Sequence, residues 1–202
     1  DGLTAACVYK PVAGERPLWD FPDGTLAERE VAAYELSAAA GWDIVPPTIY
    51  RDGPAGPGMV QLWIAEDDSA DIVQLIRSRT SAQLRRIAVF DAVINNADRK
   101  GGHLLPTADG KIYGVDHGVT FHAQDKLRTV LWQWAGEPLP EQTCETLIGL
   151  RARLDRDLGE RLRELLTGRE VRGTIRRVDD LLAFSRHPEP SEDWPPIPWP
   201  PM

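Results

Sequence analysis

Short apolar runs separated by turn residues dominate the first third of the chain. Residues 4–9 are apolar and β-prone and lead into a proline, which predicts a short strand stopped by that proline. Residues 44–50 and 59–64 flank the Gly- and Pro-rich segment 52–58, a pattern that predicts a hairpin. An alanine-rich stretch that ends at residue 40 lies between these strands and predicts one helix.

The two ends of that helix carry recognisable signals. Thr25 stands three residues before Glu28, the spacing at which a hydroxyl and a carboxylate cap the first turn reciprocally. Gly41 follows the last helical position and provides the left-handed conformation that ends many helices. We therefore expect a capped helix here, with Glu28 serving the cap rather than chemistry.

Helical periodicity begins at residue 71. Residues 71–79 predict a short helix, and Ser81 is the expected N-cap of a longer helix that ends before the polar loop 95–102. One face of the longer helix gathers Leu84, Ile87, Ala88, Asp91 and Ile94. Two short strands at 103–105 and 111–115 then surround a turn, and two amphipathic helical segments follow at 141–166 and 174–184.

This order of elements predicts an α+β chain with a two-lobed plan. Residues 1–64 form a β-rich N-lobe with one helix, and residues 65–186 form a mostly helical C-lobe. In the tail, 187–202, seven of sixteen residues are proline, which excludes a packed helix or a central strand. The tail is either disordered or a polyproline segment, and its two tryptophans favour docking, on the protein itself or on an aromatic-lined groove elsewhere.

Composition narrows the classes of function. The 202 residues are 42% hydrophobic, enough for a core, and the formal net charge of −8 argues against a nucleic-acid partner. No stretch approaches the roughly 18 consecutive apolar residues of a membrane span, and Cys7 and Cys144 are too few for a disulfide framework. We therefore expect a cytoplasmic protein whose contact with membranes is at most peripheral.

Four chemically distinctive features occur in order along the chain. Lys10 ends the first strand, and Glu30 lies in the first helix. Asp98 lies in the polar loop, and Asp116 follows the last strand, so the two acids flank one predicted hairpin. Phosphoryl transfer from ATP requires such a set: a cation on the phosphates, a carboxylate that orients it, one beside the acceptor hydroxyl, and one that holds a divalent metal.

The residues around these positions resemble the phosphoinositide 3-/4-kinase superfamily. The resemblance rests on Tyr9-Lys10-Pro11, Glu30-Val31-Ala32-Ala33-Tyr34 with Ile44-Val45-Pro46-Pro47-Thr48, Asn96-Ala97-Asp98-Arg99 and Val115-Asp116-His117-Gly118. It covers roughly residues 5–185 and is strongest to compact bacterial, chiefly actinobacterial, members. Type II phosphatidylinositol 4-kinases and HipA-type kinases are more distant relatives. The resemblance implies an atypical protein-kinase-like fold with ATP between the lobes.

The resemblance also implies a role for each matched residue. Lys10 corresponds to the phosphate-binding lysine and Glu30 to its ion-pair partner. Asp98 matches the catalytic aspartate, braced by Arg99, and Asp116 matches the metal-binding aspartate. The adenine-binding hinge corresponds to Gln61, Leu62, Trp63 and Ile64, and Trp63 is expected to line the cleft or the core. The implied cofactors are ATP and Mg²⁺ or Mn²⁺, and the implied partners are the nucleotide and a hydroxyl-bearing acceptor.

The chain departs from the superfamily pattern in two places. His103 stands five residues after Asp98, where relatives place an asparagine that binds the second metal, and an imidazole suits Mn²⁺ better than Mg²⁺. Only nine residues precede Lys10, so the hairpin that covers the ATP phosphates is expected to be missing or too short. We also consider His117 a structural or exposed residue.

Several functional alternatives remain open at this point. The acceptor can be an inositol lipid, a protein Ser or Thr, or a small metabolite. Trp132 and Trp134 lie where lipid kinases of the family read the head group, or else they belong to a helix in the rear core. A nucleotide-binding pseudokinase or scaffold, and an enzyme that transfers a nucleotidyl group (AMPylation), would use the same residues.

Overall fold

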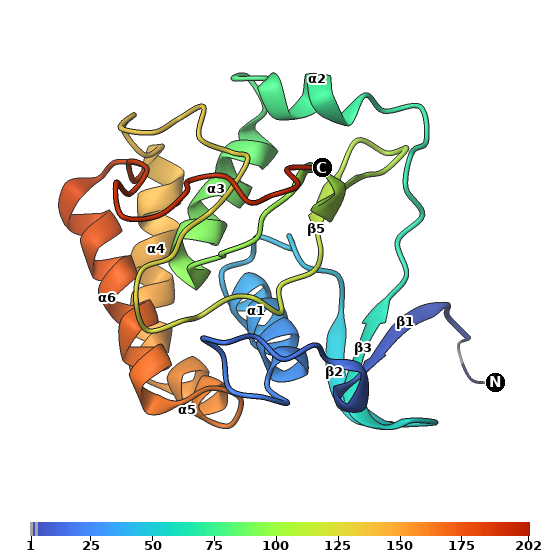
Figure 1. The fold of residues 1–202 in the computed structure, drawn as a ribbon. Coiled ribbons are helices and arrows are strands. Elements are labelled where there is room, and N and C mark those ends of the chain that lie inside the picture. Colours follow the sequence, from blue (N-terminus) through green and yellow to red (C-terminus); the bar gives the residue numbers. More distant parts are fainter. Residues whose placement is uncertain (1, 3) are drawn as a thin grey trace.

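The computed structural model describes residue 2 and residues 4–202 (Figure 1). This part of the chain is α+β, as expected, with two small antiparallel sheets and six α-helices. The missing phosphate-covering hairpin was expected from the short segment before Lys10, and residues 1 and 3 of that segment lie outside the described residues. Among the described residues, no helix combines the length and the apolar composition that crossing a bilayer requires.

The larger sheet has three strands in the order β1-β3-β2. They are β1 (Cys7–Pro11), β2 (Thr48–Gly53) and β3 (Gly56–Leu62), and the predicted hairpin is β2–β3. Pro11 does not stop β1 but is its last residue, paired with Gly58. Because β1 lies at the sheet edge, the missing N–H of a proline is tolerated there.

Helix α1 (Leu26–Ala39) connects the sheet to the rest of the molecule. It contacts β2 and β3 on one side and helix α5 (Asp157–Arg163) on another (Figure 1). The predicted stop is confirmed, because Gly41 has φ of 63° and its N–H donates to the Ala38 carbonyl. Glu30 therefore lies on a buried face of a helix that packs against β2 and β3, and β3 carries the first two residues of the predicted hinge.

The first turn of α1 is capped differently from the prediction. The Thr25 side chain accepts no capping bond from a backbone N–H of the helix, and its hydroxyl donates to a carbonyl upstream at 2.8 Å. The Glu15 carboxylate accepts instead from the N–H groups of Leu26 (3.1 Å) and Ala27 (2.8 Å). The predicted capping box with Glu28 is wrong, because a carboxylate eleven residues before the helix occupies that place.

Removing this long-range cap is expected to destabilise the protein. Glu15→Ala leaves two N–H groups of α1 without their acceptor, and the free energy of unfolding should fall by about 1 kcal/mol, the usual effect of losing an N-cap. Urea unfolding of Glu15→Ala, Thr25→Ala and Glu28→Ala measures the three effects side by side. An equal loss in Glu28→Ala would contradict the observed cap and favour the capping box.

The second half of the chain is mostly helical. Its further elements are α2 (Ile72–Arg77), α3 (Ala82–Ile94), β4 (Leu104–Pro106), β5 (Ile112–Gly114), α4 (Glu141–Leu154) and α6 (Gly168–Phe184), and short 3₁₀ turns occur at Val12–Gly14 and Gly101–His103. Strands β4 and β5 form the predicted hairpin. The Asp71 and Ser81 side chains cap α2 and α3 by accepting from the Gln74 and Leu84 N–H groups, which confirms both predicted starts.

The last helices differ in their boundaries from the predicted segments. Segment 141–166 contains α4 and α5, separated by a short break after Leu154. Helix α6 begins at Gly168, six residues before the predicted start, because Thr167 and Glu170 form a complete capping box. The cap explains the early start, since the apolar periodicity alone becomes regular only later.

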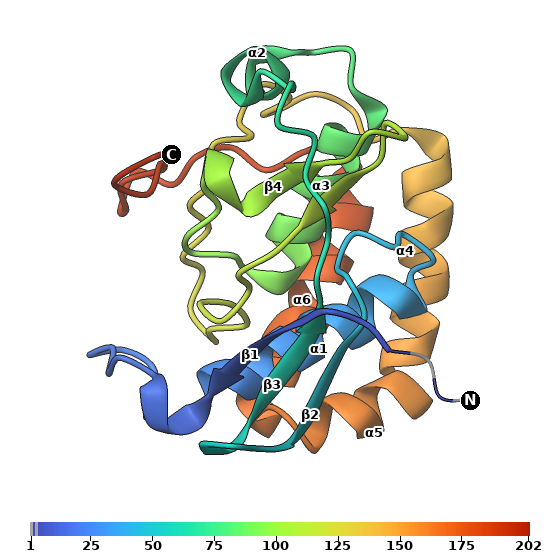
Figure 2. The same ribbon diagram turned by 90° about the vertical axis from the view of Figure 1, so that its right-hand side faces the viewer.

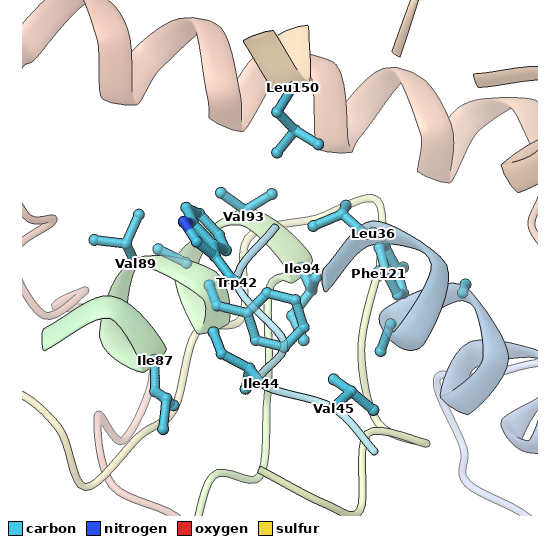
Figure 3. Close-up of a cluster of buried hydrophobic side chains, with 14 of the residues drawn as sticks. Leu36, Trp42, Ile44, Val45, Ile87, Val89, Val93, Ile94, Phe121 and Leu150 are labelled. Carbon is cyan, nitrogen blue, oxygen red and sulfur yellow. The ribbon is translucent and has the colours of Figure 1, made fainter. Parts of the chain in front are cut away.

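The apolar core joins α1, α3 and α4. Trp42 belongs to this core (Figure 3). It packs edge-to-face on Phe90 with ring centroids 6.2 Å apart. Leu36 of α1 and Leu150 of α4 are fully buried against the same cluster. All five residues of the predicted α3 face are buried: Leu84, Ile87, Ala88, Asp91 and Ile94. The core thus holds α3, and with it the loop that follows, in a fixed place.

The Pro- and Trp-rich tail docks on the protein itself. His187 begins it, donating its N–H to the Glu137 carbonyl at 2.9 Å and accepting from the Gly136 N–H at 3.1 Å. The tail, red in Figures 1 and 2, then runs back across the molecule toward the β4–β5 hairpin. Of the two alternatives that the sequence left open, docking is therefore confirmed.

His187 makes this anchor sensitive to acid. Burial lowers the pKa of its imidazole, and Arg85, which donates to Nε2 at 3.1 Å, lowers it further, to about 4. The unfolded side chain titrates near 6.5, so between pH 6.5 and 4 the unfolded state binds more protons and stability falls as pH falls. Between pH 7.5 and 4.5, the urea midpoint of unfolding should fall less steeply in His187→Gln than in the wild type, because glutamine cannot ionise. Equal slopes of midpoint against pH in the two proteins would contradict this.

Candidate functional site

The Lys10 ammonium joins three separate elements. Its Nζ lies 2.9 Å from Oε1 of Glu30 on α1 and 2.8 Å from Oδ1 of Asp116 in the loop after β5. The Glu30 side chain is buried, whereas those of Lys10 and Asp116 are about half exposed, at 45% and 51%. The structure therefore brings together three residues from distant parts of the sequence and leaves a cation and a carboxylate open to a ligand.

The two ion pairs of Lys10 stabilise the charges of Lys10 and Asp116. Burial lowers the pKa of Lys10, but the Glu30 and Asp116 carboxylates outweigh burial and raise that pKa above its ordinary value. Burial raises the pKa of Asp116, but Lys10 outweighs it and the pKa is lowered. Burial raises the pKa of Glu30, and Lys10 offsets only part of that effect. Lys10 thus stays charged and Asp116 stays ionised at neutral pH.

His103 lies beside the same carboxylate. Its Nε2 is 3.4 Å from Oδ2 of Asp116, and its Nδ1 is buried with no hydrogen-bond partner among the described residues. Burial lowers the pKa of His103 more than Asp116 raises it, so the ring is neutral at neutral pH and can offer a lone pair. Asp116 itself has φ of 60°, a left-handed conformation unusual for a non-glycine residue.

The loop with Asp98 is ordered by two asparagines. Asn95 ends α3 in a left-handed conformation, and its side-chain amide donates to the carbonyls of His122 and Gln124. Asn96 accepts from the Asp98 N–H at 2.9 Å. The Asp98 carboxylate is partly exposed, and its Oδ2 lies 3.0 Å from Nζ of Lys100. Asp98 therefore faces solvent from a rigid turn, with a lysine two positions away as its ion-pair partner.

Arg99 is fully buried and acts on the site through its neighbours. Its Nε and Nη2 donate to the buried Asp91 carboxylate of α3 at 2.9–3.1 Å. Its Nη1 donates to the carbonyls of Val115 (3.0 Å) and His103 (3.3 Å), on either side of the β4–β5 hairpin. A side chain without exposed surface cannot touch a substrate, so Arg99 is a positioning residue that fixes the chain next to Asp116 and His103.

Two residues of this buried network escaped the sequence analysis. Asp91 was noted only as a member of an apolar helix face, although a carboxylate on such a face signals a buried ionic partner. His117 is completely buried; its N–H donates to Oε2 of Glu30 at 2.8 Å and its Nε2 lies 2.6 Å from Nη2 of Arg99. The prediction of a structural His117 fits this position, but no sequence signal indicates that it links Glu30 to Arg99.

The predicted hinge comprises the last two residues of β3 and the two residues after it. The Gln61 amide donates to the Thr48 hydroxyl at 2.8 Å, and the N–H groups of Leu62 and Trp63 donate to the carbonyls of Pro47 and Ala6. Trp63 is 60% exposed, so of its two expected places, the cleft or the core, the core is wrong. Trp63 and Ile64 lie beyond the end of β3, and the Trp63 N–H already donates to Ala6, which leaves the Ile64 main chain as the candidate to contact adenine.

The two tryptophans of the predicted acceptor segment have separate roles. Trp134 is 1% exposed and belongs to the core, and Trp132 is partly exposed and donates its indole N–H to the Pro196 carbonyl at 2.8 Å. Neither lies in a helix, so the helical alternative for this segment is wrong. The segment instead consists of turns and irregular backbone, and Trp132 contacts the tail.

Asp116 and His103 supply only part of a metal-binding shell. No group of three or more His, Cys, Asp or Glu side chains in residues 4–202 is arranged to hold a metal ion by itself. One ionised carboxylate and one neutral imidazole fit a divalent ion that shares its shell with a phosphate-bearing ligand, the usual arrangement for Mg²⁺ with nucleotides. The residues therefore fit such an ion only together with a nucleotide.

Comparison with known proteins adds a distant link to lipid kinases. No family model matches the chain. Phosphatidylinositol 4-kinase gamma 4 of Oryza sativa subsp. japonica is 28% identical over 67% of this chain. The matched part is 27% of the plant protein, so this chain spans about a quarter of that kinase's length.

A much stronger similarity connects the chain to a mycobacterial protein. Protein Rv2133c of Mycobacterium tuberculosis (strain ATCC 25618 / H37Rv) is 45% identical over 96% of this chain. The aligned part covers 82% of that protein. Because this identity extends over most of both sequences, the chain belongs to the same protein family as Protein Rv2133c.

Proposed function

We propose that the chain is an ATP-dependent phosphotransferase of the phosphoinositide 3-/4-kinase-like type, with residues 1–64 as its N-lobe and 65–186 as its C-lobe. One observation carries this proposal: the Lys10 ammonium lies between the buried Glu30 carboxylate and the half-exposed Asp116 carboxylate, at 2.9 and 2.8 Å. Distant similarity to a plant phosphatidylinositol 4-kinase supports it. The γ-phosphate would pass to a hydroxyl of an acceptor.

Each residue of the candidate site has a proposed role in phosphoryl transfer. Lys10 binds phosphate oxygens and stays oriented by Glu30. Asp98 approaches the acceptor hydroxyl and accepts its proton late in the transfer, since phosphoryl transfer depends mostly on positioning and charge. Arg99 positions the loops that carry Asp116 and His103. Adenine would lie against the main chain at Ile64, beyond the end of β3.

Asp116 and His103 would hold a divalent ion together with the nucleotide phosphates. When bound, such an ion neutralises negative charge on the phosphate oxygens. Lys10 would then exchange its contact with Asp116 for one with the phosphate, while Glu30 keeps it in place. Imidazole suits Mn²⁺ better than Mg²⁺, so we propose that Mn²⁺ supports the function at least as well as Mg²⁺.

Calorimetric nucleotide binding and release or transfer of the γ-phosphate test the proposal. We expect the chain to bind ATP only in the presence of a divalent ion, with faster turnover in Mn²⁺ than in Mg²⁺. In His103→Asn, which restores the oxygen donor found in relatives, the preference should move toward Mg²⁺. A chain that binds no nucleotide with either ion contradicts the proposal.

A nucleotide-binding pseudokinase is the second candidate, and the direct Lys10–Asp116 ion pair favours it. That contact occupies one oxygen of the metal-binding carboxylate and must be released before both oxygens can serve a metal. ATP binding without turnover in either metal supports this candidate. Incorporation of AMP into protein would instead support nucleotidyl transfer, which needs the same residues.

A further inference from the structure

The tail makes directed hydrogen bonds along its docked part. The Pro196 carbonyl accepts from the Thr129 N–H at 3.0 Å and from the Trp132 indole N–H at 2.8 Å. The Pro201 carbonyl accepts from the Gly101 N–H at 2.8 Å. The Arg128 guanidinium also donates to the Ile197 carbonyl, at 3.4 Å. Four donors of the protein therefore bind three main-chain carbonyls of this part of the tail, and two of the three belong to prolines.

A buried lysine holds the start of this docked part. The Lys126 side chain is 4% exposed and forms an ion pair with Asp20. Its Nζ lies 5.0 Å from the ring centroid of Trp194 in the tail and 4.9 Å from that of Trp19. Such cation–π contacts are strongest when the cation is withdrawn from water, as Lys126 is. Trp199, in contrast, is 85% exposed and contributes little to docking.

The surface under the tail adjoins the loop of Asp98. The Arg99 N–H donates to the Arg128 carbonyl at 3.1 Å, and the Val130 N–H donates to the Arg99 carbonyl at 3.2 Å. The segment that binds the tail is thus hydrogen-bonded to the chain position next to Asp98. At Gly101 the contact is so close that a Cβ would lie 2.6 Å from Sδ of Met202.

We propose that Gly101, Lys126, Thr129 and Trp132 form a binding surface for an extended, proline-containing peptide, and that residues 194–202 occupy it as a ligand in cis. Proline-rich segments suit such a surface because they have few N–H groups of their own to satisfy and lose little entropy on binding. Main-chain carbonyls supply the hydrogen bonds, and a tryptophan at the Trp194 position supplies the contact with Lys126.

This inference deepens the proposed function in one respect. If Asp98 receives the acceptor, then the tail stands on the acceptor side of the site, and the acceptor recognised there is a polypeptide segment rather than a lipid. The peptide-binding surface itself does not depend on phosphotransfer, and its test needs neither nucleotide nor turnover.

Exchange of the tail for a free peptide tests the surface. The full chain is prepared with a protease recognition sequence in place of the exposed residues 191–193 and is cleaved only after folding. A fluorescently labelled peptide of residues 194–202 is then added, and its anisotropy is followed. Before cleavage, the tethered tail competes with the free peptide at an effective concentration near the millimolar range. The apparent affinity of the protein for the free peptide should therefore be at least about 100-fold weaker before cleavage than after it.

Matched peptide variants identify the contacts. Trp194→Ala in the labelled peptide should weaken binding about fivefold or more through loss of the Lys126 contact, while Trp199→Ala should leave it unchanged. In the protein, Trp132→Phe keeps an aromatic ring but removes the indole N–H, and binding should weaken about fivefold. Release of the tail should also speed hydrogen exchange at the Gly101 and Thr129 amides.

The outcomes separate this inference from the proposed function. Equal binding of a scrambled peptide, equal effects of the two tryptophan substitutions, or no binding after cleavage would overturn the surface, whatever the chain does with ATP. Peptide binding by a chain that neither binds nor turns over nucleotide would leave the surface intact and overturn the phosphotransferase.

Discussion

Asp116→Asn is expected to lower phosphotransfer on the order of 10²–10³-fold without unfolding the protein. The substitution removes the one carboxylate that is both ionised and accessible beside Lys10. Asparagine matches the shape of aspartate and is among the few residues that readily adopt φ near 60°, so the strained backbone at this position is retained. The loss should therefore come from chemistry and metal binding rather than from folding.

The measurement is the rate of γ-phosphate transfer, with nucleotide binding followed separately. Asp109→Asn is the matched control, because Asp109 lies in the turn of the same β4–β5 hairpin and is exposed. Lys10 keeps Glu30 as a partner in Asp116→Asn, so the unfolding midpoint should move little. If Asp116→Asn keeps wild-type turnover, Asp116 is not the metal-binding carboxylate and the proposed arrangement is wrong.

Local sequence signals predicted the parts of this structure that depend on neighbouring residues. The start of α2 near residue 71, the cap at Ser81, the stop at Gly41 and the β4–β5 hairpin each follow from a few adjacent positions. The pairing of Lys10 with Glu30, expected from the resemblance, is also present at 2.9 Å.

Contacts between distant residues could not be predicted in this way. Glu15 caps α1 across a loop, and the spacing of Thr25 and Glu28 gives no indication of it. The tail was expected to dock somewhere, but its place follows from Lys126 and Trp132, which no local pattern connects to prolines more than 60 positions later. Such contacts depend on how elements pack in space, a property that periodicity does not encode.

The Asp91–Arg99 pair shows how strongly a missed contact can matter for stability. Asp91→Ala removes the carboxylate that accepts from two guanidinium nitrogens and from the Asn96 amide, all of them buried. The Arg99 charge then stays in the core without its counterion, which typically destabilises a protein by about 3–5 kcal/mol. Because whole domains are stable by about 5–15 kcal/mol, we expect the urea midpoint to fall by a large fraction.

Two controls distinguish a buried ion pair from an ordinary salt bridge. Asp155→Ala breaks the exposed i,i+4 pair with Arg151 and should change stability by about 0.5 kcal/mol or less. Asp91→Leu combined with Arg99→Met replaces the pair with apolar groups and should recover part of the stability lost in Asp91→Ala.

The double variant still lacks the guanidinium that holds the Val115 and His103 carbonyls, so phosphotransfer should stay low although the fold recovers. Recovery of both properties would contradict the positioning role of Arg99, and a small loss in Asp91→Ala would contradict the buried pair itself.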